Sequence, residues 1–173
     1  MATGVHTERL DLRPVAPEDA AALYEIFSDP AGWWYDPDSR HTEPATTERW
    51  CERAAAAWER DGLSYWTVRE LSTGAVIGVG GAQRQRTGNW NLNYRIASDR
   101  QRQGLAGELA RAAMEAAVQH DPSVPIIAWA AENNLPSRRV AERVGLVDRG
   151  PHVDPSDGQT RLAYTDRPFD PPR

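Results

Sequence analysis

The clearest pattern along the chain is the alternation in NWNLNYRIA, residues 89–97. Large apolar side chains occupy every second position and Asn or Arg occupies the positions between, which predicts a strand with one buried face. Two other β-like stretches, SYWTVREL and AVIGVGGAQRQ, come just before it and are joined by the turn sequence Ser-Thr-Gly. Residues 64–97 are therefore predicted to form three consecutive antiparallel strands.

Four other segments carry apolar residues at helical spacing. They are EDAAALYEIF, TTERWCERAAAAWER, LAGELARAAMEAAVQHD and LPSRRVAERV. Thr46 or Thr47 is expected to cap the second of these helices, which runs to about Asp61, and Gly145 is expected to end the fourth. In the third helix, Glu108 is spaced to pair with the arginine three residues later.

The remaining strands complete a mixed sheet. ERLDLRPV predicts a first strand, PIIAWA a central strand buried on both faces, and LVDRG and TRLAYTD one or two last strands. The element order β-α-α-β-β-β-α-β-α-β-β indicates a mixed α/β fold in which helices cover a sheet. No repeat or long linker divides the chain, so residues 1–173 are expected to form one domain with flexible ends at 1–7 and 166–173.

Composition and charge exclude several classes of function. The net charge of −5 and pI near 5.4 leave no basic excess for binding nucleic acid. No apolar run approaches the length of about 18 residues that predicts a membrane span. All 20 basic residues are Arg, which excludes a lysine Schiff base or a P-loop lysine. Cys51 is the only cysteine and lies in a helical pattern, so a packing role and a reducing, cytoplasmic compartment are expected.

The stretch SDRQRQGLAGEL, residues 98–109, places small residues at the start of the third helix. Gly104 and Gly107 allow the backbone to approach a partner closely, and the N–H groups of a helix N-terminus attract anions. Two interpretations stay open here: an anion cradle, most naturally for a phosphate, and a turn that only starts the helix. A dinucleotide fingerprint is not met, because the glycines of GVGGAQ continue as strand with no helix behind them.

Two motifs lie on either side of the apolar strand PIIAWA. Gln101-Arg102-Gln103-Gly104-Leu105-Ala106 fits the pattern Gln/Arg-x-x-Gly-x-Gly/Ala, and Asn134-Leu135-Pro136-Ser137 precedes an amphipathic helix that ends in Gly. In this order they resemble motifs of the GCN5-related N-acetyltransferase (GNAT) superfamily, in the branch of the ribosomal-protein N-terminal acetyltransferases. The opening ERLDLRPVAPEDAAALYEIFSDP is similar to that branch's first strand and helix, so the resemblance covers about residues 8–165. It implies a mostly antiparallel central sheet with helices on both faces.

The resemblance implies acetyl-CoA as cofactor and assigns its contacts to two segments. The N–H groups of the glycine loop would hold the pyrophosphate, and small side chains there leave room for the pantetheine arm. That arm is expected to bind the backbone of Ile96 and Ala97 like an added strand, while Arg100 or Arg102 meets the 3′-phosphate or simply faces solvent. The expected cofactor-binding residues are Ile96, Ala97, Gln101, Arg102, Gln103, Gly104, Leu105, Ala106, Gly107 and Asn134.

Acetyl transfer to an amine needs a base for the ammonium proton, a donor to the oxyanion and a partner for the leaving thiolate. The resemblance points to Ser137 as catalytic hydrogen-bond donor to sulfur, with a helix N-cap as the alternative role. Asn134 is either a turn residue or a contact to the pantetheine arm. Many relatives carry Glu where Asn91 stands here, so the base is left to bound water or to the loop between the first two helices. That loop holds Asp36, Asp38, His41 and Glu43.

The same loop contains the aromatic cluster Trp33, Trp34 and Tyr35, in a segment that helps to wall the acceptor site in this family. At least one of them is expected to bind an apolar, aromatic or cationic acceptor group, with a lid over the first helix or a homodimer contact as alternatives. The resemblance thus predicts an acetyl-CoA-dependent N-acetyltransferase for a small-molecule or peptide amine, with no metal, membrane or nucleic acid. Two hypotheses keep the fold but change the activity: another acyl-CoA donor, and an acyl-CoA-binding sensor without catalysis, which Asn91 suggests.

Overall fold

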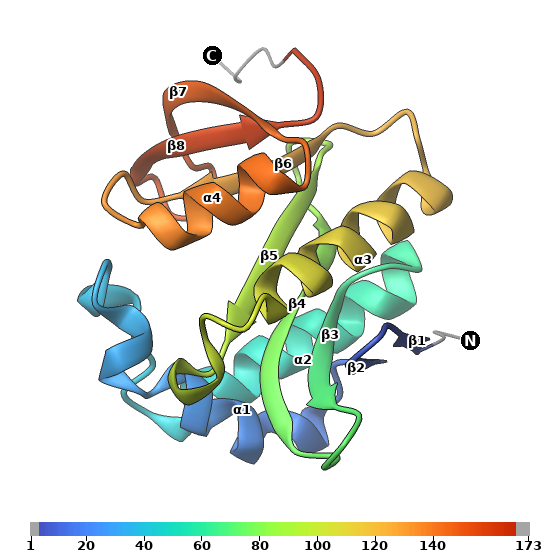
Figure 1. Cartoon of the computed structure of the whole chain (residues 1–173), viewed down its shortest axis with the longest axis vertical. Coiled ribbons are helices and arrows are strands. Elements are labelled where there is room, and N and C mark those ends of the chain that lie inside the picture. Colours follow the sequence, from blue (N-terminus) through green and yellow to red (C-terminus); the bar gives the residue numbers. More distant parts are fainter. Residues whose placement is uncertain (1–3, 169–173) are drawn as a thin grey trace.

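The computed structural model describes residues 4–168 and shows a central sheet with helices packed on it (Figure 1). Within these residues the strands pair in the order β1-β2-β3-β4-β5-β6-β8-β7. The strands are β1 Val5–His6, β2 Leu10–Pro14, β3 Tyr65–Glu70, β4 Val76–Arg84, β5 Trp90–Ile96, β6 Ile126–Ala130, β7 Val147–Val153 and β8 Thr160–Thr165. The helices are α1 Ala20–Phe27, α2 Pro44–Asp61, α3 Leu105–His120 and α4 Leu135–Arg143, with short 3₁₀ helices η1 Pro17–Asp19, η2 Pro30–Trp33, η3 Pro37–Ser39 and η4 Ser98–Arg100. None of the helices in this part of the chain is long and apolar enough to cross a membrane.

The stretches with the clearest sequence patterns form the centre of the sheet. β3, β4 and β5 are consecutive antiparallel neighbours, and Trp90 and Leu92 of β5 are buried, as the alternation predicts. β6 lies between β5 and β8, parallel to the first and antiparallel to the second. The predicted mixed α/β fold, with a mostly antiparallel sheet and helices on both faces, is confirmed.

The N-terminal end adds one strand that the sequence pattern did not predict. Val5–His6 pair with Leu12 and Asp11 of β2 and so form β1 at the edge of the sheet. Part of the segment expected to be a flexible end is therefore tied to the fold. Residues 1–3 and 169–173, which belong to the same expectation, lie outside the described residues.

The helices cover the two faces of the sheet and create two cores (Figure 1). α3 packs on β4 and β5, and α4 lies beside it on the same face; Leu109 and Trp66 belong to this core. α1 and α2 cover the other face, where Phe27 and Cys51 are buried with Val79 of β4. Burial, with added repulsion from nearby carboxylates, raises the pKa of the Cys51 thiol to about 11, which supports the predicted packing role.

The start of α2 differs from the sequence prediction, whereas its end agrees. Pro44 is the first helical residue and Glu43 occupies the N-cap position, so the cap predicted for Thr46 or Thr47 is wrong. Thr47 is instead buried inside the helix, with its hydroxyl 2.8 Å from Nδ1 of His41. The helix ends at Asp61, where Gly62 adopts the left-handed conformation, with φ of 71°, that terminates many helices.

Candidate functional site

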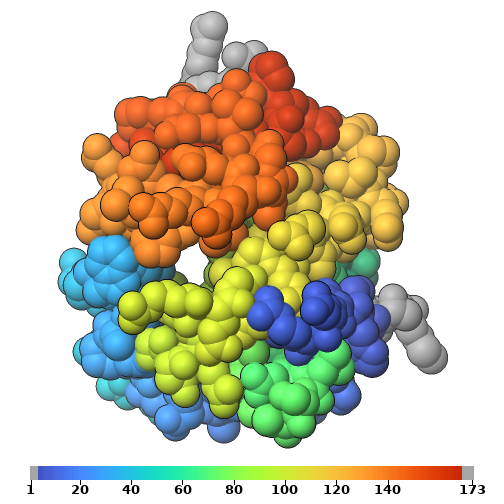
Figure 2. Space-filling model, in the orientation of Figure 1, coloured from blue at the N-terminus to red at the C-terminus, as the bar shows by residue number. Residues whose placement is uncertain are grey.

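The site lies where β5 and β6 separate. These strands pair only through Trp90–Ile126 and Asn91–Ile127, so the later part of β5 has one free edge in the middle of the sheet. Ala97 donates its N–H to Ile77 O on β4 at 2.8 Å, and N–H directions alternate along a strand, so the N–H groups of Tyr94 and Ile96 point to the free edge. Figure 2 shows an opening at this place, bordered by the segments coloured for α4, for residues near 100 and for residues near 35.

Two residues with positive φ shape the loop that leads into α3. Gly104, with φ of 81°, is the N-cap of α3, and Arg102, with φ of 62°, is the only non-glycine residue within 4–168 that has a positive φ. A side chain at Gly104 would be strained, because L-residues pay for the left-handed conformation. Such alternation of backbone conformation directs successive N–H groups to one side and forms an anion-binding concavity.

The backbone N–H groups where this loop enters α3 make no hydrogen bond to any residue that the structure describes. Among residues 4–168 no group accepts a hydrogen bond from the backbone N–H of Gln103, Gly104 or any of residues 105–107. The first turn of a helix leaves such donors free, and the dipole of α3, 16 residues long, adds partial positive charge. The cradle therefore fits the diphosphate of the cofactor that the sequence motif implies.

Side chains from two other places hold the loop in position. Arg9 donates from Nη1 to Gln103 O and from Nε to Glu108, both at 2.8 Å. Gln101 donates from Nε2 to Ile96 O at 3.0 Å and ties the loop to β5. Sequence reasoning missed Arg9, which stands 94 positions before its loop contact, and wrongly paired Glu108 within its own helix.

Several predicted cofactor residues take roles other than those expected. Ala97 donates its N–H to Ile77 O on β4, and its C=O accepts from the N–H of Arg100. The N–H of Ala97 therefore does not face the free edge, and the predicted contact with the pantetheine arm is left to its C=O, which has a second lone pair. The residue that joins Ile96 on the free edge is Tyr94, which the motif did not mark. The Leu105 side chain is buried in the core, which leaves only its N–H for the cradle.

The arginines near the loop divide into paired and unpaired side chains. Arg100 forms an ion pair with Glu70 at 3.3 Å, whereas Arg102 is exposed and has no ion-pair partner within residues 4–168. Of the two arginines expected near the 3′-phosphate, Arg102 is thus the one with a free guanidinium. A hollow of about 380 Å³, lined in part by Arg9, Gln103 and Leu105, adjoins the loop.

Ser137 lies in the first turn of α4, across the opening from β5. Its Oγ donates to Tyr94 Oη at 3.2 Å, and Tyr94 Oη donates to the Ser137 carbonyl at 3.0 Å. Asn134 Oδ1 accepts from the Ser137 N–H at 3.2 Å, so Asn134 and not Ser137 caps the helix. Burial raises the pKa of Tyr94 to about 12, so its hydroxyl stays protonated near neutral pH.

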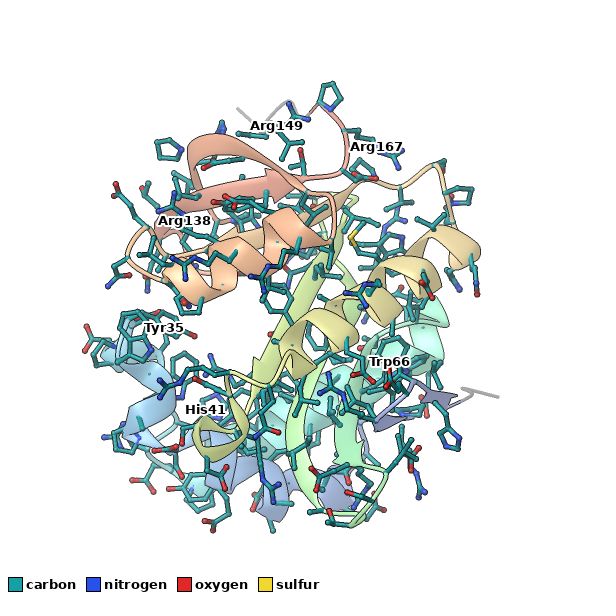
Figure 3. All side chains as sticks on the ribbon, in the orientation of Figure 1. Tyr35, His41, Trp66, Arg138, Arg149 and Arg167 are labelled. Carbon is teal, nitrogen blue, oxygen red and sulfur yellow. The ribbon has the colours of Figure 1, made fainter. Side chains whose placement is uncertain are left out.

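The aromatic cluster on the opposite face divides into a buried and an exposed part. Trp33 is buried, donates from Nε1 to Phe27 O at 2.7 Å, and carries the Arg95 guanidinium 3.7 Å from its ring centroid. Trp34 is 52% exposed and meets the ring of Tyr35 edge-on at 5.6 Å. Trp33 therefore offers no free face to an acceptor, and the predicted contact is left to Trp34 and Tyr35. Figure 3 shows Tyr35 on the rim of the opening, across from α3.

The loop after β7 forms a second wall beside this cluster. Arg161 of β8 binds Asp154 at 2.8 Å and Asp157 at 2.7 Å, and it reaches Asp36 of the aromatic loop at 3.5 Å. Asp36 also accepts from Ser39 Oγ at 2.7 Å. These contacts join the two walls and engage Asp36, one of the loop residues considered as a base.

No carboxylate stands on β5 at the position expected for the base. Asn91 donates from Nδ2 to Tyr65 Oη at 2.6 Å, and burial raises the pKa of Tyr65 to about 12. His41, stacked on Phe27 at 4.4 Å, is held by Thr47. Burial and the charges of nearby arginines lower the pKa of His41 to about 4, so it is neutral at pH 7.

Comparison with known proteins gives one family and a consistent set of structural relatives. The model of the acetyltransferase (GNAT) domain family matches residues 9–147. The Bacillus subtilis protein YkkB, itself uncharacterised, is 28% identical over 148 residues, which are 83% of this chain and 85% of that protein. An acetyltransferase from Agrobacterium tumefaciens superposes with a TM-score of 0.79 at 24% identity, covering 95% of this chain and 94% of its own. RimL, a ribosomal L7/L12 α-N-protein acetyltransferase solved with coenzyme A, superposes with a TM-score of 0.76 at 15% identity, covering 94% and 97%. At these identities the two structures show a shared fold.

Proposed function

The chain belongs to the GNAT acetyltransferase family, and from that premise we propose that it transfers the acetyl group of acetyl-CoA to a primary amine of a small molecule or of a peptide or protein N-terminus. The amine attacks the bound thioester directly. Residues 1–173 act as a single domain, and the buried state of the only thiol, Cys51, suits a reducing cytoplasm.

The cofactor sites follow from the free backbone groups. The N–H groups of residues 103–107 bind the diphosphate, with Gln101 and Arg9 holding the loop in shape. The N–H groups of Tyr94 and Ile96 on the free edge of β5 bind the pantetheine arm in the manner of a neighbouring strand. When bound, acetyl-CoA supplies the activated thioester.

The chain's own groups then serve the three needs of the transfer. A backbone N–H on the free edge of β5 donates to the carbonyl oxygen as negative charge develops there. Ser137 turns its hydroxyl from Tyr94 Oη to the departing sulfur, while Tyr94 keeps the first turn of α4 in place through the Ser137 carbonyl. Asn91 does not ionise, so a bound water takes the proton from the amine.

The observation that carries the proposal is the glycine-capped loop whose N–H groups are free. Gly104→Val forces a β-branched side chain into a φ of 81°, which displaces these N–H groups and weakens CoA binding by at least about tenfold. Calorimetric titration with CoA measures the effect. Gly88→Val is the matched control, because Gly88 has a φ of 84° in the β4–β5 turn and open space around it.

Turnover is tested separately by thiol release from acetyl-CoA with a panel of primary amines. Thiol release with at least one amine supports the transferase. An unchanged CoA affinity in Gly104→Val would overturn the cradle, whereas firm binding with no thiol release from any amine would favour the acyl-CoA sensor.

A further inference from the structure

Arg95 is a half-buried cation, and the part of the chain that the structure describes supplies no counter-ion for it. Within residues 4–168 no carboxylate lies within ion-pair distance of its guanidinium, whose partners are all neutral. Nη1 donates to Gly32 O at 3.1 Å, Nη2 donates to Tyr35 Oη at 2.7 Å, and the Trp33 ring lies 3.7 Å away. A charge withdrawn from water is costly without a partner of opposite sign.

A carboxylate close in sequence turns to a different arginine. Asp36 directly follows Tyr35, yet it is held by Arg161 at 3.5 Å and by Ser39 at 2.7 Å. Arg161, in the neighbouring wall, contacts three carboxylates, whereas Arg95 contacts none among the residues that the structure describes. The charge of Arg161 is therefore neutralised by carboxylates, whereas the positive charge of Arg95 on β5 is not.

The contacts of Arg95 fix the orientation of its remaining donors. A guanidinium has five N–H groups, and two of them are used on Gly32 and Tyr35, which leaves three. The stacked Trp33 ring holds the guanidinium plane, so little side-chain freedom is lost when a further partner binds. A planar guanidinium of this kind matches a carboxylate through two parallel hydrogen bonds.

The position of Arg95 along β5 places it next to the reaction centre. It stands between Tyr94 and Ile96, whose N–H groups line the free edge. Side chains alternate along a strand, so Arg95 projects to the face opposite Tyr94 and Ser137, the face of the aromatic loop. Asn93 shares this face and its amide has no hydrogen-bond partner within the described residues.

We propose that Arg95 binds an anionic group of the acceptor, so that the acceptor class is an amine that carries a carboxylate near its amino group. This inference rests on the proposed acetyl transfer and narrows its substrate. The carboxylate lies on Arg95, with Asn93 as a second donor, and the amino group of the same molecule reaches the thioester at the free edge of β5. The aromatic loop orients the guanidinium and, through the exposed Trp34, borders the rest of the acceptor.

Matched acceptors test this assignment directly. Glycine, phenylalanine and glutamate are each compared with their α-carboxamide in the thiol-release assay at constant pH. We expect kcat/KM to favour the free acid by at least about tenfold, the margin that a charge-assisted over a neutral hydrogen bond provides. The carboxamide raises the fraction of neutral amine at pH 7, so a preference for the acid runs against intrinsic reactivity.

Variants of Arg95 distinguish binding of the acceptor carboxylate from support of the aromatic loop. Arg95→Met is expected to reduce the ratio of kcat/KM for the acid to kcat/KM for the amide to near one. Arg95→Lys should restore part of this ratio, because lysine returns the positive charge but not the planar pair of N–H donors. Arg84→Met is the matched control: Arg84 is also a strand arginine over a tryptophan ring, 5.4 Å from Trp90, and its loss should leave the ratio unchanged. A wild-type ratio near one, or an equal loss with acid and amide in Arg95→Met, overturns the proposal.

A binding measurement keeps this test independent of turnover. N-acetylglycine and N-acetylglycinamide, which resemble the products of acetyl transfer, are titrated calorimetrically into CoA-saturated protein. Tighter binding of the acid that is lost in Arg95→Met supports the anion site even if no amine releases thiol, in which case the proposed transfer alone fails. Equal binding of the two probes contradicts the anion site.

Discussion

Two adjacent tryptophans differ in what a substitution should do. Trp33 is buried and hydrogen-bonded, so Trp33→Ala is expected to lower the free energy of unfolding by about 3–5 kcal/mol. Trp34 is exposed, so Trp34→Ala should change stability by less than about 0.5 kcal/mol while raising the acceptor KM several-fold. Urea unfolding and KM values for both substrates measure these effects. A rise of the same size in the KM for acetyl-CoA would show that Trp34 does not act on the acceptor.

The low pKa of His41 makes stability depend on pH in a defined window. The pKa is about 4 in the folded protein, chiefly because of burial, and has the ordinary histidine value of 6.5 in the unfolded chain, which therefore takes up the proton first as the pH falls. Above pH 6.5 His41 is neutral in both the folded and the unfolded protein and does not affect the free energy of unfolding. As the pH falls from 6.5 to 4, the unfolded chain binds the proton more tightly, so the free energy of unfolding decreases. His41→Asn keeps a polar group near Thr47 but does not titrate, so its stability should fall less than that of the wild type on acidification. Unfolding at pH 7.5, 6.5, 5.5 and 4.5 gives the comparison, and parallel curves would contradict it.

The role of a single residue was predictable where the backbone conformation at its position requires a particular residue type. The special backbone conformation of Gly104 was predictable because a left-handed position before a helix favours glycine, and the structure gives it a φ of 81°. Its assignment to the cofactor cradle stays a prediction. The roles proposed for Arg9, Tyr94 and Arg95 could not be predicted from the sequence, because they depend on which distant segment lies against each residue. The alternation in β5 predicted the face of Arg95 correctly but contained no information about the aromatic loop that packs there.

At the scale of elements, α3 is anchored through its first turn. Burial of the Glu108 carboxyl opposes ionisation, but hydrogen bonds from Thr7 and from Arg9 outweigh it and lower the pKa. Thr7 Oγ1 donates at 2.5 Å and the Arg9 N–H at 2.8 Å, so one carboxylate ties the β1–β2 turn to the helix that starts the cradle.

Glu108→Gln is therefore expected to lower the free energy of unfolding by about 1.5–3 kcal/mol, the range for a lost hydrogen bond to a charged group. Glu115→Gln, at an exposed position of the same helix, is the control and should change stability little. Because the pKa of Glu108 is lowered, its contribution is present above pH 4.5, the ordinary value, and is lost as the pH falls further. The difference between the two variants should shrink in urea unfolding at pH 3.5, and a constant difference would argue against a charged anchor.

Element boundaries show where local sequence rules reach their limit. The end of α2 was predictable because Gly62 accommodates the left-handed C-cap. The start of α4 has Ser137 as its alternative cap in the sequence pattern, yet Asn134 caps it, since Pro136 already lies inside the first turn. Ser and Asn are equally good caps, so composition alone does not decide between them.

For the molecule as a whole, hydrophobic periodicity predicted the sheet, its helices and their order. β1 was missed because two residues are too few to show a period, and its pairing depends on the turn held by Glu108. The sequences of β5 and β6 do not indicate where the two strands separate. Their buried positions are apolar both where the strands pair and where they do not. The single-domain organisation over residues 1–173 stays a prediction.

The separation of β5 from β6 leaves an unpaired strand edge, which bears on how the protein avoids aggregation. Unpaired strand edges normally invite a strand from another molecule, and here such an edge lies in the interior of the sheet. An incoming polypeptide would carry side chains on both faces, and these would collide with Tyr94 and Ser137 on one side and with the stacked arginine on the other. A ligand without side chains would avoid both contacts, so we expect this edge to accept such a ligand more readily than a strand from another molecule.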